Sequence, residues 1–314
     1  MPVTLAEAQQ NAQDDLSVSV IDEFRGNTLL NLLTFDDCVS PTGGGTLTYA
    51  YRRLATRSTA GFRAINSEYV PTEVTTAPVS VDLKPLGGSF QVDRVVSRVG
   101  PALSGAITLN MSQKIKSARD TFGDAIINGD STADANSFEG LNRILDGTGQ
   151  EISGAAYDWS ALDEAKSQAV IDTLDEFLAN IDGGVSVIAG NRRVLAAVRS
   201  AARRVGYYDR APGAAGTTVE TYAGIPLYDT GYRVSNADVI PVTGGTTDLY
   251  AFRLGMDAVH GVSMAGSPLV QQWLPDFTTA GAVKTGEVEM GPVAVAVKAS
   301  KSAAVLRGVR VSAA

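Results

Sequence analysis

The segment 104–141 constrains the fold of this chain more than any other, because it opens with one long amphipathic pattern. Apolar residues recur at steps of three and four, as one face of an α-helix requires; they are Met111, Ile115, Ala118, Phe122, Ala125 and Ile126. A helix over 104–128 would be roughly 37 Å long at a rise of about 1.5 Å per residue. A helix of that length with one apolar stripe must lie across a flat apolar surface, so the sequence predicts a spine helix packed on strands.

The end of the spine helix is expected at Gly129, because glycine adopts left-handed backbone angles without a Cβ clash. A polar stretch follows that allows either a calcium site or a plain turn; its oxygen-bearing residues are Asp130, Asp134, Asn136 and Glu139. The spacing differs from an EF-hand loop, since Phe138 occupies a ligand position and the required glycine and final glutamate are misplaced. We therefore expect a polar turn.

Composition indicates an ordinary globular protein: the 314 residues are 44% hydrophobic and 19% charged. The net charge of −8 argues against a dedicated nucleic-acid-binding protein, although it allows a surface that faces nucleic acid. The single cysteine, Cys38, forms no intrachain disulfide and fits a reducing cytosol. Residues 1–10 lack the pattern of a signal peptide, and no apolar run has the length of a membrane span. We expect a soluble cytosolic chain without a membrane segment.

The first hundred residues predict an arm and a projecting hairpin. Helical patterns over 5–16 and 19–33 have little core of their own, and the breaker at 41–45 separates them from a strand pattern at 46–51. Residues 52–78 interleave charged residues with small ones, and strand patterns return at 79–83 and 89–96. A hairpin with arms of this length would reach on the order of 50 Å. Because a lone hairpin is marginal in water, we expect a neighbouring molecule to hold it.

Residues 159–268 predict an α/β unit. A helix is expected to open at Ser160, capped together with Asp163, and to end at Gly183 and Gly184. A buried strand at 185–189 and a helix from Asn191 to Val205 follow. Short strands are expected at 221–229, 239–242 and 248–252. The Val- and Ala-rich run 286–311, above all 292–297, suits a buried strand that returns beneath the spine helix.

Two motifs allow enzymatic interpretations. The only histidine, His260, precedes Ser263 in a segment similar to a nucleophile elbow, but Ala265 stands where that motif needs glycine. Asp229 begins an Asp-Thr-Gly triplet, as in aspartic proteases, which need two such carboxylates where the chain has one. The alternative interpretation is therefore an enzyme, either an α/β hydrolase that uses Ser263 or a dimeric protease that uses Asp229. We prefer the interpretation that both motifs are turns. With one histidine, HExxH and His-rich zinc sites are excluded.

A basic cluster marks the expected helix 191–205; its members are Arg192, Arg193, Arg199, Arg203 and Arg204. Helical spacing places Arg192, Arg199 and Arg203 on one face. That face is either solvated or an ion-pair surface between subunits, and the negative net charge makes phosphate contact less favoured.

The order of these segments, together with two motifs, resembles a known family. The first motif is Asn128-Gly129-Asp130 followed by Phe138-Glu139-Gly140-Leu141, and the second is Tyr222-Ala223-Gly224-Ile225-Pro226-Leu227-Tyr228. In combination they are similar to the major capsid proteins of tailed bacteriophages (Caudoviricetes), whose fold was first seen in phage Hong Kong 97. The resemblance covers essentially the whole chain. It implies an α+β fold with an N-terminal arm (1–44), an extended loop (45–78), a peripheral domain (79–158 and 269–314) and an axial domain (159–268).

The resemblance implies a structural protein and not an enzyme, with no cofactor and no metal. It would be the subunit of an icosahedral head, self-assembling into hexamers and pentamers around packaged double-stranded DNA. Expected partners are a separate scaffolding protein, a portal and, as a further candidate, a decoration protein. The expected location is the virion, after assembly in the cytoplasm of a bacterial host. Contacts between subunits are hypothesised at Arg52, Arg53, Arg57, Arg63, Glu68, Arg192, Arg199 and Arg203.

Two departures from the family pattern matter. Members that crosslink covalently use a lysine on the extended loop, and residues 46–78 contain none, so we expect a shell without crosslinks. A long helical scaffolding segment at the N-terminus is also missing, which is why the scaffolding protein is expected to be separate. The nearest alternative with the same fold is an encapsulin, the shell protein of a bacterial nanocompartment, which would enclose a cargo enzyme instead of DNA.

Overall fold

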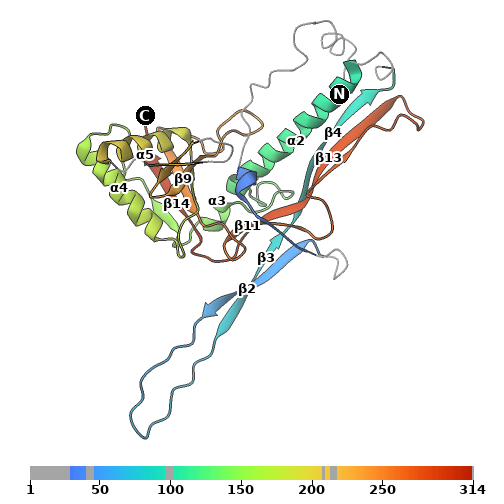
Figure 1. Cartoon of the computed structure of the whole chain (residues 1–314). Helices are drawn as coiled ribbons and strands as arrows, with labels where there is room; N and C mark the ends of the chain where they lie inside the picture. The colour runs from blue at the N-terminus through green and yellow to red at the C-terminus, as the bar shows by residue number, and fades with distance from the viewer. Residues whose placement is uncertain (1–28, 40–45, 96–101, 207–208, 213–217, 313–314) are drawn as a thin grey trace.

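A long helix, two large sheets and a projecting hairpin make up the fold (Figure 1). The computed structural model describes residues 29–39, 46–95, 102–206, 209–212 and 218–312. The body combines helices with strands that are mostly antiparallel, so the expected α+β class is confirmed. No helix in these ranges has the length and apolar character needed to cross a bilayer.

The first sheet is built on β13 (Val283–Val297), the longest strand of the described chain. It runs antiparallel to β4 (Lys84–Asp93), β12 (Val270–Trp273) and β11 (Val259–Met264), and β1 (Phe35–Val39) pairs parallel with β11. The spine helix, α2 (Ala102–Asn128), lies along β4 and β13 (Figure 1). The expected packing of a long helix on strands before and after it is therefore confirmed.

The apolar stripe of α2 contacts two separate clusters. Near its start, Met111 packs with Phe90, Val92 and Val288. Near its end, Phe122 and Ile126 are buried in a larger cluster. Ile115 was expected in the stripe but is 37% exposed, because it belongs to neither cluster. Ile127 lies outside the stripe and is fully buried, since other elements surround the end of the helix.

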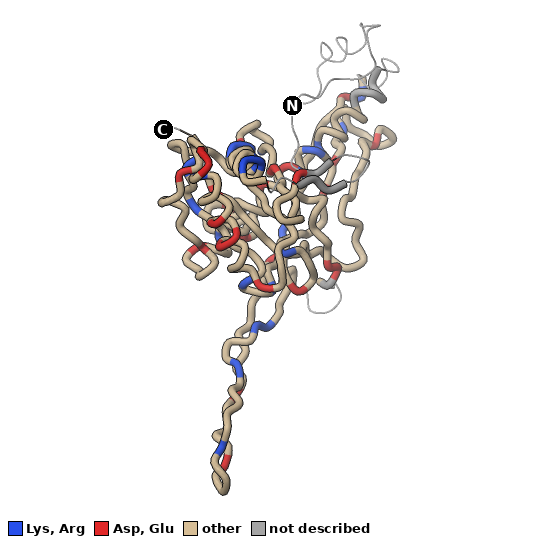
Figure 2. Tube along the Cα trace, turned by 60° about the vertical axis from the view of Figure 1, so that its left-hand side comes forward, with Lys and Arg blue, Asp and Glu red and all other residues tan. Residues whose placement is uncertain are grey.

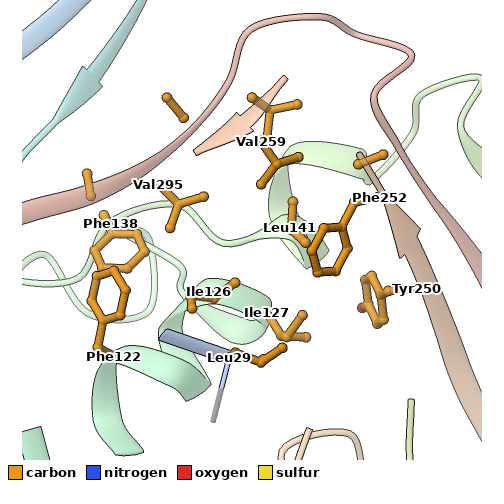
Figure 3. Close-up of a cluster of buried hydrophobic side chains, with 14 of the residues drawn as sticks. Leu29, Phe122, Ile126, Ile127, Phe138, Leu141, Tyr250, Phe252, Val259 and Val295 are labelled. Atoms are coloured by element: carbon orange, nitrogen blue, oxygen red, sulfur yellow. The ribbon is translucent and has the colours of Figure 1, made fainter. Parts of the chain in front are cut away.

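The second sheet has seven strands, in the order β5 (Glu151–Ser153), β14 (Ala303–Arg310), β10 (Thr246–Phe252), β6 (Val187–Gly190), β9 (Ile225–Asp229), β8 (Thr218–Tyr222) and β7 (Asp209–Pro212). Successive residues of β10 face opposite sides. Leu249 and Ala251 pack in a cluster with α4 (Glu164–Ala179) and α5 (Arg192–Val205). Tyr250 and Phe252 lie in the cluster that holds the end of α2 (Figure 3). Both faces of the sheet are therefore buried at its centre.

Strand pairing differs from the expectation at both ends of the α/β unit. β14 pairs with β10 in the second sheet, whereas the run 286–311 was expected entirely beneath α2. β11 pairs with β13 in the first sheet, although its residues were assigned to the α/β unit. The sheets thus do not follow the limits 159–268 and 269–314, and the domain limits stay a prediction. The cause is that β13 and β14 are adjacent in sequence but pair in different sheets.

Several local expectations change as well. The expected strand 221–229 is two strands, β8 and β9, joined at Ala223 and Gly224, which both have positive φ. Residues 239–242 form no strand, although Val239 is buried. Residues 29–32 form a short 3-10 helix, η1 (Leu29–Leu32), and β1 follows it without having been predicted. The expected helix 5–16 and most of 19–33 lie outside the described residues.

The cap of α4 is Asp163 and not Ser160. The Asp163 carboxylate accepts a hydrogen bond from the backbone N–H of Lys166 at 2.7 Å. Ser160 lies in the preceding turn, where its N–H and hydroxyl donate to Asp158 and lower the pKa of that carboxyl to about 2. Asn191 caps α5 as expected, accepting from the N–H of Arg193 at 2.9 Å.

Two glycines join α2 to the rest of the body. The N–H of Gly140 donates to the carbonyl of Gly129 at 2.8 Å, and α3 (Leu141–Leu145) begins at the next residue. A Cβ on Gly129 would lie 2.3 Å from the carbonyl oxygen of Phe138, and one on Gly140 would lie 2.5 Å from that of Ala125. Gly129 is not among the glycines with positive φ. The stop expected at Gly129 is confirmed, because α2 ends at Asn128. The left-handed reason predicted for it was wrong, since glycine is required here by backbone proximity.

Arg307 on β14 ties this junction to the second sheet. Its guanidinium donates to Glu151 of β5 at 2.9 Å and to Asp248 of β10 at 3.0 Å, and it contacts Asn142 of α3. It also lies 3.1 Å from the hydroxyl of Tyr250. Burial, only partly offset by Arg307, raises the pKa of Tyr250 to about 12, so the phenol stays neutral. These contacts connect four elements through one side chain.

We predict that Gly140→Ala destabilises the fold, because the new Cβ would lie 2.6 Å from the nitrogen of Gly129 and 2.7 Å from the carbonyl oxygen of Ile127. Backbone atoms cannot move aside cheaply, so the expected loss of unfolding free energy is about 1–3 kcal/mol. Urea unfolding measures it. Gly149→Ala is the matched control, since a Cβ there meets nothing within 4 Å. Equal stability of the two variants would contradict the role given to Gly140.

Candidate assembly surfaces

The hairpin leaves the body as a two-stranded ribbon (Figure 1). β2 (Thr48–Thr56) pairs antiparallel with β3 (Thr75–Asp82), and residues 57–74 continue beyond the paired strands. Residues 57–74 are all exposed. A projecting chain segment of this length in which every residue is exposed indicates a surface that meets another molecule.

The tip of the hairpin carries exposed apolar side chains. Phe62 is 110% exposed, Ile65 91% and Val70 82%, relative to the accessible area of each residue type. Leu54, Tyr69 and Val74 add to the same ribbon. Scattered apolar residues are common on protein surfaces, but several on one projecting segment are typical of an interaction site.

The base of the hairpin is clamped to the end of β13. The Tyr51 hydroxyl donates to the carbonyl of Val297 at 2.7 Å. Arg53 donates through Nε to the carbonyl of Lys298 at 2.8 Å, and also to the carbonyl of Val297 and to the Tyr51 hydroxyl. Tyr51 and Arg53 are two residues apart on a strand, so they face the same side. Arg53 was predicted as a contact between subunits, but its described contacts lie within the chain.

A second layer lies beneath the clamp. The ammonium group of Lys298 is 5.4 Å from the centre of the Tyr49 ring, and that ring packs edge-on against the buried His260 at 6.1 Å. Burial lowers the pKa of His260 and is the largest effect. The hydrogen bond between the His260 ring and the Ala258 carbonyl opposes this shift, Lys298 adds to it, and Asp36 and Asp257 oppose it more weakly. The sequence predicted a strand over 46–51, but nothing in it indicated the carbonyl partners on β13.

The remaining hairpin residues predicted as subunit contacts are exposed. Arg52 contacts the hydroxyl of Thr76 at 3.4 Å, and Arg63 contacts the carbonyl of Ser67 at 3.2 Å and lies over the Tyr69 ring. Arg57 and Glu68 lie on the exposed segment beyond the paired strands. Figure 2 shows basic residues along the hairpin and an acidic one near its tip. Their role between subunits stays a prediction.

The predicted arginines of α5 already have partners within the chain. Arg192 pairs with Asp229 at 2.9 Å, and Arg199 pairs with Glu220 at 2.6 Å. Arg203 is exposed and approaches the carbonyl of Arg199 at 3.4 Å. The two ion pairs connect α5 to β9 and β8, which gives Arg192 and Arg199 a role inside the subunit. A further role between subunits is untested and remains a hypothesis.

The two enzymatic interpretations lack the required geometry. His260 and Ser263 are three residues apart on β11, so their side chains face opposite sides of the strand. Ser263 donates instead to Asp37, and the ring nitrogen Nδ1 of His260 lies near the carbonyl of Ala258. Asp229 pairs with Arg192 and accepts from the N–H of Gly231 at 3.0 Å, as a turn residue does. The described residues therefore form neither a serine nor an aspartic catalytic arrangement.

The acidic stretch after α2 is a polar turn. Asp130 accepts hydrogen bonds from the hydroxyl and the N–H of Thr132, which lower its pKa, and Asp134 accepts from the N–H of Asn136. Glu139 accepts from the Ser131 hydroxyl. Within the described ranges no three metal-ligating side chains lie close enough together to hold an ion. The preference for a turn over a calcium site fits this geometry.

Comparison with known proteins identifies the fold. No family model and no curated protein matches the sequence. Among solved structures, the chain is similar to the holo-SrpI encapsulin complex of Synechococcus elongatus PCC 7942, with a TM-score of 0.67 and 17% identity, covering 99% of this chain and 97% of that one. It is similar to the capsid of Myoviridae phage XM1, with a TM-score of 0.62 and 12% identity over 95% and 97%. It is also similar to the capsid of a native GTA particle, with a TM-score of 0.61 and 14% identity over 95% and 96%.

These matches span nearly the whole length of both partners in each comparison. The fold is the one that phage capsid proteins and encapsulins share. More particularly, the fold is of the Hong Kong 97 type, as the sequence resemblance predicted. At identities below 20% the likeness establishes the fold and not the function.

We predict that Arg53→Met loosens the hairpin base, because methionine keeps part of the apolar stem but donates no hydrogen bond. Amide hydrogen exchange in β2 and β3 should be faster by about tenfold or more, since bonds from a charged donor are lost. Mass spectrometry of the exchanged peptides measures this. Arg52→Met is the control, because Arg52 is exposed and its contact is with Thr76. Similar exchange in both variants would show that the clamp is not what holds the ribbon.

We predict that His260 makes the fold less stable as the pH falls below about 6.5, the value of an unperturbed histidine. Its folded-state pKa is lowered, so the unfolded chain binds the proton more readily and stability falls down to the folded pKa. Urea unfolding at pH 7.5 and 5.5 should show a smaller difference in His260→Gln than in the wild type. The slope attributable to one histidine is at most about 1.4 kcal/mol per pH unit. An identical pH dependence in the two proteins would refute it.

Proposed function

We propose that this chain is the structural subunit of an icosahedral bacteriophage head. Its copies self-assemble into hexamers and pentamers, and the shell encloses packaged double-stranded DNA. The observation that carries the proposal is the full-length likeness to shell proteins, which covers 95% or more of this chain in each comparison above. The projecting hairpin with an apolar tip supports it, since such a ribbon needs a neighbouring surface.

The proposed assembly depends on repeated contacts between copies. The extended loop, proposed as residues 45–78, and the N-terminal arm, proposed as residues 1–44, clasp neighbouring subunits. The axial domain, proposed as residues 159–268, meets its copies at the local axes, and rings close there by head-to-tail contacts. Each contact can be modest, because many form at the same time. The hairpin contributes Arg52, Arg57, Arg63 and Glu68 to these contacts, and α5 contributes Arg203.

The partners follow from this role. A separate scaffolding protein would guide a precursor shell, a portal would admit the DNA, and a decoration protein is a further candidate. Packaging is followed by a rigid-body rearrangement of subunits that expands the shell. Assembly takes place in the cytoplasm of the bacterial host, and the mature location is the virion. The chain binds no cofactor and catalyses no reaction in this role.

An encapsulin-type nanocompartment is the second candidate. It is favoured by the likeness to the encapsulin of Synechococcus elongatus, which covers 99% of this chain. The same subunit contacts would build such a shell, and its content would be a cargo enzyme in place of DNA. The contents of the particle distinguish the two functions.

We predict that the purified chain, expressed with its neighbouring genes, forms closed icosahedral particles in negative-stain electron microscopy. Nuclease-protected DNA inside them supports the phage head, and a co-purifying enzyme supports the encapsulin. A soluble monomer or dimer at every concentration tested would overturn both. The same particles, boiled in SDS, should run as monomers, because residues 46–78 contain no lysine for a crosslink. A ladder of covalent multimers would contradict that expectation.

A further inference from the structure

A shallow basic cavity, open to solvent along one side, lies where the hairpin meets the body. It has a volume of about 620 Å³ and is lined on the hairpin side by residues 51–54 of β2. On the body side it is lined by the turn after β13 and by the loops that follow α4 and β10. Its basic residues are Arg52, Arg53, Arg253, Lys298 and Lys301, and its acidic residues are Asp182 and Asp257. The cavity is therefore positive in a chain whose net charge is −8.

The positive charge of this cavity is not neutralised by its own carboxylates. Asp257 pairs with Arg253 at 2.7 Å, and Asp182 lies 3.9 Å from Lys301. Arg52 and Arg53 form no ion pair among the described residues, and their hydrogen bonds go to a hydroxyl and to carbonyl oxygens. Nε of Arg253 is buried without a hydrogen-bond partner in the described part of the chain. The cavity thus has capacity for further negative charge.

An acidic loop of opposite character lies beside the other strand of the hairpin. Residues 130–139 contain Asp130, Asp134 and Glu139 and no lysine or arginine, and residues 132–136 are exposed. Residues of the loop line one pocket together with residues 79–82 of β3, and Lys84 at the start of β4 donates to the carbonyl of Ala135 at 2.9 Å. Its turn hydrogen bonds keep Asp134 in place on the surface. Among the described residues, the ion pairs of the basic cavity are made with Asp257 and Asp182 and not with this loop.

We propose that the basic cavity of one copy binds the acidic loop 130–139 of a second copy of this chain. The two surfaces differ and flank the same hairpin, so their pairing is heterologous: the loop of each copy faces the cavity of the next. A contact of this kind repeats from copy to copy and closes into a ring when the rotation allows. It also opposes the repulsion between subunits that each carry a net charge of −8.

A protein loop suits this cavity better than nucleic acid does. Asp182 and Asp257 lie at the rim, with side chains 75% and 73% exposed. They would repel a continuous row of phosphates, whereas a loop can place Asp134 among the basic groups and uncharged residues beside the acidic ones. Because the charges are exposed, salt weakens the contact: the screening length is about 8 Å at physiological ionic strength.

Charge exchange tests the pairing. Arg52→Glu with Lys301→Glu reverses the cavity, Asp134→Lys reverses the loop, and a third protein carries all three changes. Each reversal should lower the apparent association constant more than about tenfold, because it brings like charges together. The triple variant should recover most of the loss, since opposite charges again face one another. Sedimentation velocity at several concentrations and salt levels measures association, and circular dichroism confirms that each variant is folded.

Arg204→Glu is the matched control, because Arg204 is an exposed arginine of α5 outside the cavity. A protein that combines Arg204→Glu with Asp134→Lys, without the two cavity changes, should not recover association. Normal assembly of the cavity or loop variants, or no recovery in the triple variant, overturns the pairing. The cavity variant is also tested for binding to a 20-base-pair DNA duplex. If it loses this binding while its assembly is unchanged, the cavity binds nucleic acid and the proposed pairing is overturned. The inference rests on the proposed function in one respect, because it requires copies of the chain to associate. If the wild-type chain never associates, the result refutes the proposed function and not the pairing of cavity and loop.

Discussion

The backbone contact between Gly129 and Gly140 is the constraint on which the rest of the body depends. The hydrogen bond from Gly140 to the carbonyl of Gly129 closes the loop after α2 and starts α3 at a fixed place. It directs Phe138 and Leu141 into the cluster that buries Phe122 (Figure 3). Any side chain at either glycine would overlap backbone atoms. The spine helix and the second sheet are therefore joined by a contact that only glycine permits.

The second sheet connects the end of α2 to the layer of α4 and α5, because both faces of the sheet are buried at its centre. Alternate residues of β10 belong to different clusters, so the layer of α4 and α5 and the end of α2 pack on opposite sides of the same strands. Arg307 adds polar contacts between α3, β5 and β10. The hairpin, by contrast, contacts the body at its base, through Tyr49, Tyr51 and Arg53. A force on the hairpin would therefore reach the body at the end of β13, which runs through the first sheet.

Local patterns predicted the elements well where one periodicity dominated. The helical periodicity and the capping residues predict the spine helix and the helices at 164–179 and 192–205. The alternation of residues predicts the strands at the hairpin. Ile115 fits the period but is exposed, because burial depends on whether a partner exists at that level of the helix. The basic residues of α5 were recognisable, yet their partners Asp229 and Glu220 were not, since they come from strands far along the chain. The clamp at Arg53 was missed for the same reason: carbonyl acceptors have no sequence signature.

By itself the sequence determined the spine helix, the ribbon of small and charged residues that precedes it, and the two motifs that resemble capsid proteins. These depend on local periodicity, turn chemistry and composition, which a linear pattern records. Only the tertiary structure decided that β13 and β14 enter different sheets and that Gly129 is required by packing and not by a left-handed turn. It also decided that a basic cavity and an acidic loop flank one hairpin. Such features arise from pairing between distant segments, and their energies depend on distances that the order of residues does not contain.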